Sequence, residues 1–187
     1  MSVDSLGFVR AIEGLPEQLA KAHEDAAVAL DRSVLPRPDE IDHIVVLGMG
    51  GSGIAGDVLR AVASSLPIPV IVLKQIRTPA FVGPRTLAFA VSYSGNTEET
   101  NAMATGALDA GARLVAVTAG GDLAALAAER SAIHVPCVEG YVMPRAAIGA
   151  LVAPLFVAPF HMGIYPEGHA LLVQAAAQLK RRCEQCR

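Results

Sequence analysis

The chain has 187 residues, of which 52% are hydrophobic and 18% charged, and this composition predicts a globular protein with a sizeable core. The net charge of −3 arises from 15 basic and 18 acidic side chains without a basic block, so nucleic acid is not an expected partner. Aromatic residues make up only 4% and tryptophan is absent, which argues against a platform for stacking bases.

Three cysteines in a chain of this size favour a reducing compartment, and we expect a cytoplasmic protein. The Cys183–Cys186 pair lacks a second pair of ligands, so no metal site is predicted. The first ten residues include acids and lack an apolar stretch, so no signal peptide is predicted. The longest apolar run, Ala146 to Phe160, contains two prolines and is too short for a bilayer core of about 30 Å. We therefore predict a buried helical segment there and no membrane association.

The pattern of apolar residues predicts alternating helices and strands. Segment 4–32 is predicted to be helical because its apolar residues recur at helical spacing, and Pro16 suits a first-turn position. Short apolar runs typical of buried strands lie at 43–47, 70–73, 87–91, 114–118 and 133–135. Further helices are predicted at 53–64, at 96–110, in a short segment ending at 130, and from 145 to about 182 with a break near 164–169.

This alternation indicates βαβ units, which form a parallel sheet with helices on both faces. We therefore predict a doubly wound α/β domain, an αβα sandwich with a five-stranded parallel sheet. The predicted organisation is a helical segment at 1–40, the central domain at 41–162, and a C-terminal helix and tail at 163–187. Ligands of such sheets bind beyond the carboxyl ends of the strands, so the loops after the first and third strands are candidate sites.

The loop after the first strand carries a glycine pattern. Gly48, Gly50 and Gly53 match G-x-G-x-x-G between a strand and a helix, which suits a dinucleotide. An NAD site wants an acid about 20 residues further on, yet no Asp or Glu occurs between positions 57 and 98. The second strand ends in Lys74, which could serve NADP, so an NADP-dependent oxidoreductase stays open as one interpretation.

The loop after the third strand, "VSYSGNTEET", is rich in hydroxyls. Ser92, Ser94 and Thr97 cluster where a strand meets a helix, and hydroxyls with backbone N–H groups at a helix start can bind a phosphate. The alternative is helix capping, with Asn96 as N-cap and Glu99 at the third helical position. Capping leaves the two serines unexplained, because both precede the helix.

A third signal is "YVMPRAAIGA", in which Pro144 suits the first position of a helix. Arg145 then lies in the first turn, where a cation faces the positive end of the helix dipole at a cost of up to about 1 kcal/mol. Near an anion site such a cation can be a ligand.

Together, "LGMGGSGIAGD", "SYSGNTEET" and "MPRAAIG" resemble the N-terminal sugar isomerase (SIS) domain of the bifunctional phosphoglucose/phosphomannose isomerases, from about residue 41 to 155. The resemblance implies a phosphosugar-binding domain that needs no metal or cofactor. It also implies aldose–ketose isomerisation through a cis-enediol, interconverting fructose 6-phosphate with glucose 6-phosphate or mannose 6-phosphate. The resemblance implies that the sugar phosphate is held by Ser92, Ser94 and Thr97. It implies that the sugar is lined by Gly50, Gly51 and Ser52, and that Arg145 lies beside the reacting carbons.

Members of that family carry a second SIS domain, which supplies the glutamate base, the ring-opening histidine and a lysine. No matching segment occurs before Arg187, so we expect this domain to be missing here. We therefore expect the chain to be a truncated product, half of a split enzyme, or a phosphosugar-binding homo-oligomer. The expected partner is a second copy of the chain in a homodimer, or another chain that carries a second SIS domain. A non-catalytic phosphosugar-binding module is the other reading. The remaining acids and imidazoles are expected to be satisfied or solvent-facing: His134, Glu139, His161, Glu167 and His169.

Overall fold

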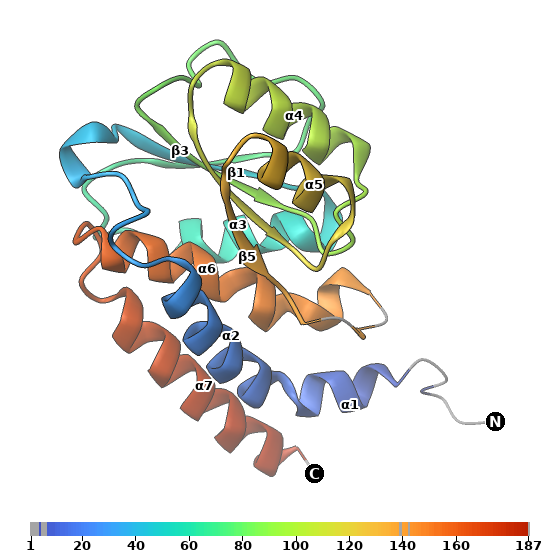
Figure 1. Ribbon diagram of the computed structural model, residues 1–187. Helices are drawn as coiled ribbons and strands as arrows, with labels where there is room; N and C mark the ends of the chain where they lie inside the picture. The colour runs from blue at the N-terminus through green and yellow to red at the C-terminus, as the bar shows by residue number, and fades with distance from the viewer. Residues whose placement is uncertain (1–3, 5–6, 139, 142, 187) are drawn as a thin grey trace.

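Five parallel strands form the centre of the fold, in the order β2-β1-β3-β4-β5 (Figure 1). The computed structural model describes residues 4, 7–138, 140–141 and 143–186. Every predicted strand is present, with ends within one residue of those expected, and this confirms the predicted fold class. The strands are His43–Leu47 (β1), Val70–Leu73 (β2), Thr86–Val91 (β3), Arg113–Thr118 (β4) and Ile133–Pro136 (β5).

The helices differ from expectation mainly at their ends. The predicted helix at 4–32 is two helices, because Gly14 separates them and Pro16 begins the second. The helix after β1 starts at Gly50 rather than Gly53, so the glycine loop is already part of its first turn. The α-helices are Phe8–Glu13 (α1), Leu15–Ala29 (α2), Gly50–Val62 (α3), Glu98–Asp109 (α4), Gly121–Glu129 (α5), Ile148–His161 (α6) and Gly168–Gln185 (α7). Two 3-10 helices, Pro38–Glu40 (η1) and Pro144–Ala147 (η2), complete the set in the described chain.

Alternate side chains of the strands enter two separate hydrophobic cores. Ile44 and Val46 of β1 pack with α2, α3, α6 and α7, whereas Val45 and Leu47 pack with α4 and α5. Figure 1 shows the same layers, with α4 and α5 on one face of the sheet and α3 and α6 on the other. Because helices cover both faces, all six residues of β3 are buried, and a continuous apolar run is the expected signature.

The apolar run predicted to be a buried helix is α6. It is covered by the sheet on one side and by α2 and α7 on the other (Figure 1). The window Pro144–His161 is long and apolar enough to cross a membrane by length and composition, but 72% of it is buried inside the fold. Side chains of α2 and α7 belong to the same hydrophobic core as α6. The predicted domain boundaries near residues 40 and 163 therefore stay predictions.

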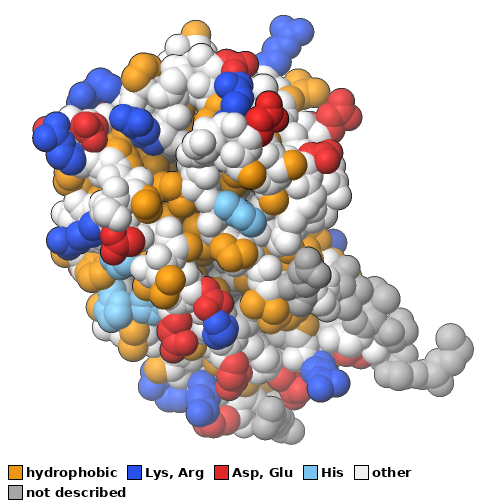
Figure 2. Space-filling view, viewed as in Figure 1, with side chains coloured by type: hydrophobic (Ala, Val, Ile, Leu, Met, Phe, Trp, Pro, Cys, Tyr) orange, Lys and Arg blue, Asp and Glu red, His pale blue; other side chains and the backbone are white. Residues whose placement is uncertain are grey.

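Charged side chains are mixed on the face drawn in Figure 2. Basic and acidic groups lie next to one another there, and no extended field of a single sign forms. Exposed ion pairs in the described part of the chain, such as Arg85 with Asp42, contribute little to stability because water screens them.

The three thiols differ in their exposure to solvent. Cys137 is buried behind β5, and burial raises the pKa of its thiol to about 12, whereas Cys186 is exposed and Cys183 half-buried. Because the thiolate is the reactive form, we expect a thiol reagent at pH 8 to modify Cys183 and Cys186 in the native protein and to spare Cys137. Mass spectrometry of labelled peptides checks this, with labelling in denaturant as the control. Modification of native Cys137 at the rate of Cys186 would contradict the prediction.

Candidate functional site

The strand order brings the first and third strands together. Because β1 lies between β2 and β3, the chain leaves β1 and β3 in opposite directions, and a crevice is expected at the carboxyl ends of two such strands. The β1–α3 loop and the β3–α4 loop both begin at these ends. They are the loops in which the sequence analysis placed the candidate residues.

The glycines of the β1–α3 loop serve close backbone packing. A Cβ at Gly48 would lie 2.9 Å from the carbonyl oxygen of Val91, and one at Gly53 would lie 2.6 Å from that of Gly48. Both distances exclude a side chain. Gly50 has a φ of 49°, a backbone conformation that favours glycine, and nothing lies within 4 Å of a Cβ at its position. The glycine pattern thus has a packing explanation that requires no dinucleotide.

The β3–α4 loop folds around the Ser92 hydroxyl. Ser92 is only 1% exposed; its Oγ donates to Thr97 Oγ1 at 3.0 Å and accepts from the N–H of Gly95 at 3.2 Å. Ser94 is exposed, and its Oγ accepts from the N–H of Asn96 at 3.3 Å. Since Thr97 Oγ1 accepts a hydrogen bond from Ser92, the Thr97 hydroxyl can donate its own proton to another acceptor.

The predicted capping of α4 is wrong. Thr97, not Asn96, occupies the N-cap position, and it makes no side-chain capping bond. The Asn96 side chain instead reaches across to α5, where its Oδ1 accepts from the N–H of Asp122 at 3.0 Å. The first N–H groups of a helix have no partner within the helix, so without a cap they can donate hydrogen bonds to a bound anion. The start of α3 likewise lacks a side-chain cap.

Contacts join the three candidate segments. The N–H of Tyr93 donates to Ser52 Oγ at 3.3 Å, which links the two loops. A Cβ at Gly51 would lie 3.0 Å from the backbone N of Arg145, so Gly51 allows η2 to pack against the start of α3. Arg145 lies in this 3-10 turn rather than in an α-helix, is exposed, and forms no ion pair within the described part of the chain. The structure therefore gathers the predicted residues at one end of the sheet.

Sequence reasoning missed the residues that hold these segments. The buried Gln18 of α2 donates to the carbonyl of Ala146 at 2.9 Å and accepts from the N–H of Gly149 at 2.6 Å, so it caps α6 beside Arg145. Tyr93 and Tyr141 line a cavity of about 260 Å³ next to Ser94. No local pattern signals Gln18, because its partners lie 128 to 132 positions away.

The remaining titratable groups make contacts of their own. His134 Nε2 lies 3.2 Å from the carbonyl of Thr118, His161 Nδ1 lies 2.6 Å from that of Leu30, and His169 Nδ1 lies 3.0 Å from His23 Nε2. Burial, and then the neighbouring His169, lower the pKa of His23. Glu167 is exposed at the start of α7, and Glu139 lies outside the described residues.

The cation considered for NADP is paired. Lys74, at the end of β2, forms an ion pair with Asp57 of α3. A 2′-phosphate would have to compete with this carboxylate for the ammonium group. The oxidoreductase interpretation is weakened accordingly.

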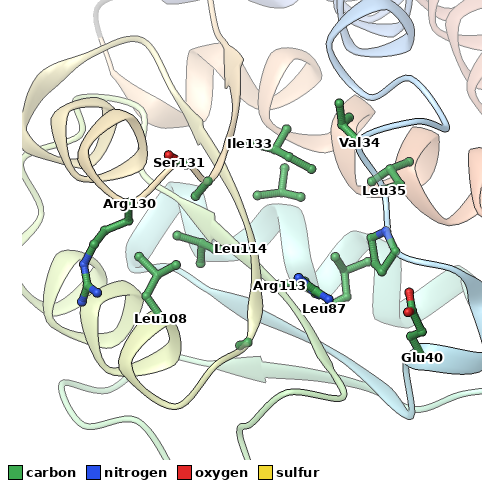
Figure 3. A pocket seen from close by; sticks show the side chains of 14 residues that line it. Val34, Leu35, Glu40, Leu87, Leu108, Arg113, Leu114, Arg130, Ser131 and Ile133 are labelled. Atoms are coloured by element: carbon green, nitrogen blue, oxygen red, sulfur yellow. The ribbon is translucent and has the colours of Figure 1, made fainter.

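A larger cavity of about 340 Å³ lies at the opposite end of the sheet, where strands β3, β4 and β5 begin (Figure 3). Its walls include Leu87, Arg113 and Ile133, which stand at the starts of β3, β4 and β5. Ligands of parallel α/β sheets bind at the carboxyl ends of the strands, so size alone does not make this cavity the functional site.

Comparisons with known proteins identify relatives of the chain. The chain is 39% identical over 155 residues to the bifunctional phosphoglucose/phosphomannose isomerase of Caldicellulosiruptor bescii, which covers 82% of this chain and 44% of the relative. It is 40% identical over 131 residues to the protein of the same name from Thermoplasma acidophilum, covering 68% and 40%. It is 32% identical over 126 residues to the D-glucosamine-6-phosphate 4-epimerase of Sulfolobus acidocaldarius, covering 67% and 39%. The chain thus spans less than half the length of these relatives.

Solved structures share the fold at lower identity. The sugar isomerase domain of an RpiR transcription factor from Sphaerobacter thermophilus matches with a TM-score of 0.57 and 21% identity, covering 95% of this chain and 99% of that one. The Vibrio vulnificus NanR protein, in complex with ManNAc-6P, matches with a TM-score of 0.57 and 22% identity, covering 88% and 67%. No protein-family model matches the chain.

The fold is the one seen in solved sugar isomerase (SIS) domains. Within that class, the chain is a homologue of part of the bifunctional phosphoglucose/phosphomannose isomerases. The resemblance drawn from the three motifs is confirmed.

Proposed function

We propose that the crevice between β1 and β3 binds a hexose 6-phosphate, with its phosphate at the start of α4. The hydroxyls of Ser94 and Thr97 and the first N–H groups of α4 would hold the phosphate, while Ser92 orients Thr97. Gly50, Gly51 and Ser52 would border the sugar from the other side of the crevice.

The observation that carries the proposal is the uncapped start of α4. Thr97, at the N-cap position, makes no side-chain capping bond, and the neighbouring Asn96 is engaged with α5. A helix start without a cap leaves polar groups unsatisfied, and a phosphate satisfies several of them at once. The relatives' names point to the same ligand class, since both name sugar phosphates or their isomerisation.

The proposed reaction is aldose–ketose isomerisation between fructose 6-phosphate and glucose or mannose 6-phosphate. A base moves a proton between C1 and C2, and negative charge develops on the enediolate oxygen. Arg145 is exposed in η2, which packs against Gly51, and has no ion pair among the described residues, so its guanidinium can stabilise that charge. Arginine keeps its proton, so the base must be another group.

We assign the glutamate base, the ring-opening histidine and the lysine to a second SIS domain, which would lie in the same longer protein or on a partner chain. The length of the relatives supports this, since this chain corresponds to 44% of the Caldicellulosiruptor bescii protein. A homodimer is the alternative arrangement. The three free cysteines accord with the proposed cytoplasmic location.

A thermal-shift panel tests the proposal. At 100 times its Kd a ligand stabilises the native state by about 2.7 kcal/mol, which corresponds to about 5–10 °C for a domain of this size. We expect fructose 6-phosphate, glucose 6-phosphate or mannose 6-phosphate to raise the Tm by this amount, and fructose and NADPH to leave it unchanged. A shift with NADPH alone would favour the oxidoreductase. A coupled assay then separates an isomerase from a non-catalytic binding module, which binds without turnover.

A further inference from the structure

Tyr93 lies between Ser92 and Ser94 in the β3–α4 loop, and both its backbone N–H and its carbonyl form hydrogen bonds to other segments. Its N–H donates to Ser52 Oγ of α3 at 3.3 Å, and its carbonyl accepts from the N–H of Ala119, after β4, at 3.0 Å. The residue therefore has a defined place relative to the β1, β3 and β4 loops. Its side chain is half-buried rather than free in solvent.

The Tyr93 hydroxyl reaches a fourth segment, the chain between β5 and η2. It donates to the carbonyl of Val138 at 3.2 Å and accepts from the N–H of Tyr141 at 2.9 Å, across 45 and 48 positions of sequence. The two tyrosine rings also meet edge to face, with centroids 6.3 Å apart. One hydroxyl thus uses both its donor and its acceptor to hold the same segment.

That segment connects two anchors. At its start the N–H of Cys137 donates to the carbonyl of Thr118 at 3.0 Å, and at its end η2 packs against Gly51. Residues 138, 140 and 141 lie between, and Gly140 and Tyr141 line the cavity of about 260 Å³. Ser94 and the two glycines that follow β4 line the same cavity.

We propose that Tyr93 is a positioning residue, whose hydroxyl fixes residues 138 and 141 ahead of η2 and so the place of Arg145 beside the sugar. This inference rests on the proposed binding of a sugar phosphate at the same site. Because both hydrogen-bonding roles of the hydroxyl are occupied, Tyr93 acts through the segment that it holds and not as an acid or base. Its effect should fall on the sugar part of the ligand and spare the phosphate.

Tyr93→Phe tests the proposal, since it keeps the ring and removes both hydrogen bonds. Isothermal titration calorimetry would measure fructose 6-phosphate and inorganic phosphate with the wild type, Tyr93→Phe and the control Tyr165→Phe. The control also loses a hydroxyl bonded to a backbone carbonyl, that of Val62 at 3.0 Å, at the far end of α3. We expect Tyr93→Phe to weaken fructose 6-phosphate about tenfold, to leave inorganic phosphate within twofold, and Tyr165→Phe to change neither affinity.

The outcomes separate the two proposals. Wild-type protein that binds no sugar phosphate overturns the proposed function, and this inference falls with it. Wild-type binding that Tyr93→Phe leaves unchanged, or weakens equally for both ligands, overturns the positioning role alone. Should Tyr93→Phe fail to fold, hydrogen exchange on the wild type decides: the Tyr141 amide must be protected, and an unprotected amide contradicts the inference.

Discussion

Replacing Ser94 by alanine and Thr97 by valine together is expected to weaken fructose 6-phosphate binding by at least about 100-fold. A hydrogen bond to a charged group contributes about 1.5–3 kcal/mol, and each 1.4 kcal/mol corresponds to about tenfold in affinity. Two such bonds are lost at once, while the N–H groups of α4 remain. Calorimetric titration of the double variant and both single variants measures the effect.

The variants also differ in their expected effect on folding. Ser94 is exposed, so Ser94→Ala should lose affinity with an unchanged Tm. Thr97→Val leaves the buried Ser92 hydroxyl without its acceptor and should lower the free energy of unfolding by about 1–3 kcal/mol. Ser64→Ala, on an exposed turn after α3, is the matched control. Wild-type affinity in the double variant would place the phosphate elsewhere.

Gly95→Ala is expected to have the largest effect on folding. Gly95 has a φ of 73°, and a Cβ there would lie 1.8 Å from the carbonyl oxygen of Gly120 and 2.8 Å from Thr118 Oγ1. The neighbour is backbone, so it cannot give way without moving the β4–α5 loop. Strain and clash together should cost at least about 3 kcal/mol and lower the Tm by about 6–12 °C or more.

The same substitution should also abolish sugar-phosphate binding, because the N–H of Gly95 donates to Ser92 Oγ and its carbonyl accepts from the N–H of Leu123 in α5, which together hold the loop in place. Circular dichroism melting and titration of the surviving folded protein measure the two effects. Gly83→Ala is the control, since its Cβ would meet only a carbonyl oxygen at 3.8 Å. A Gly95→Ala protein with the wild-type Tm would show that the two loops do not approach as closely as described.

The elements of the sheet were predictable because they leave local signatures. A strand covered on both faces must be apolar throughout, and β3 is buried at every position. The cluster of hydroxyls after β3 was visible in the same way, since Ser92, Ser94 and Thr97 lie within six positions. Local spacing was misleading at Asn96, where a residue typical of an N-cap caps a different helix 26 positions further on.

The sequence by itself determined the alternation of helices and strands and the two polar loops, because each depends on neighbouring residues. It also pointed to Arg145, but predicted an α-helical turn where the structure has a 3-10 turn. Only the tertiary structure decided that β1 lies beside β3, which brings Ser52 to Tyr93 and Gly51 to Arg145. Strand order, the capping of α6 by Gln18 and the bonds of the Tyr93 hydroxyl join residues 41 to 132 positions apart. Such contacts follow from the packing of whole elements, which minimises exposed apolar surface and satisfies buried polar groups, and no local pattern records their partners.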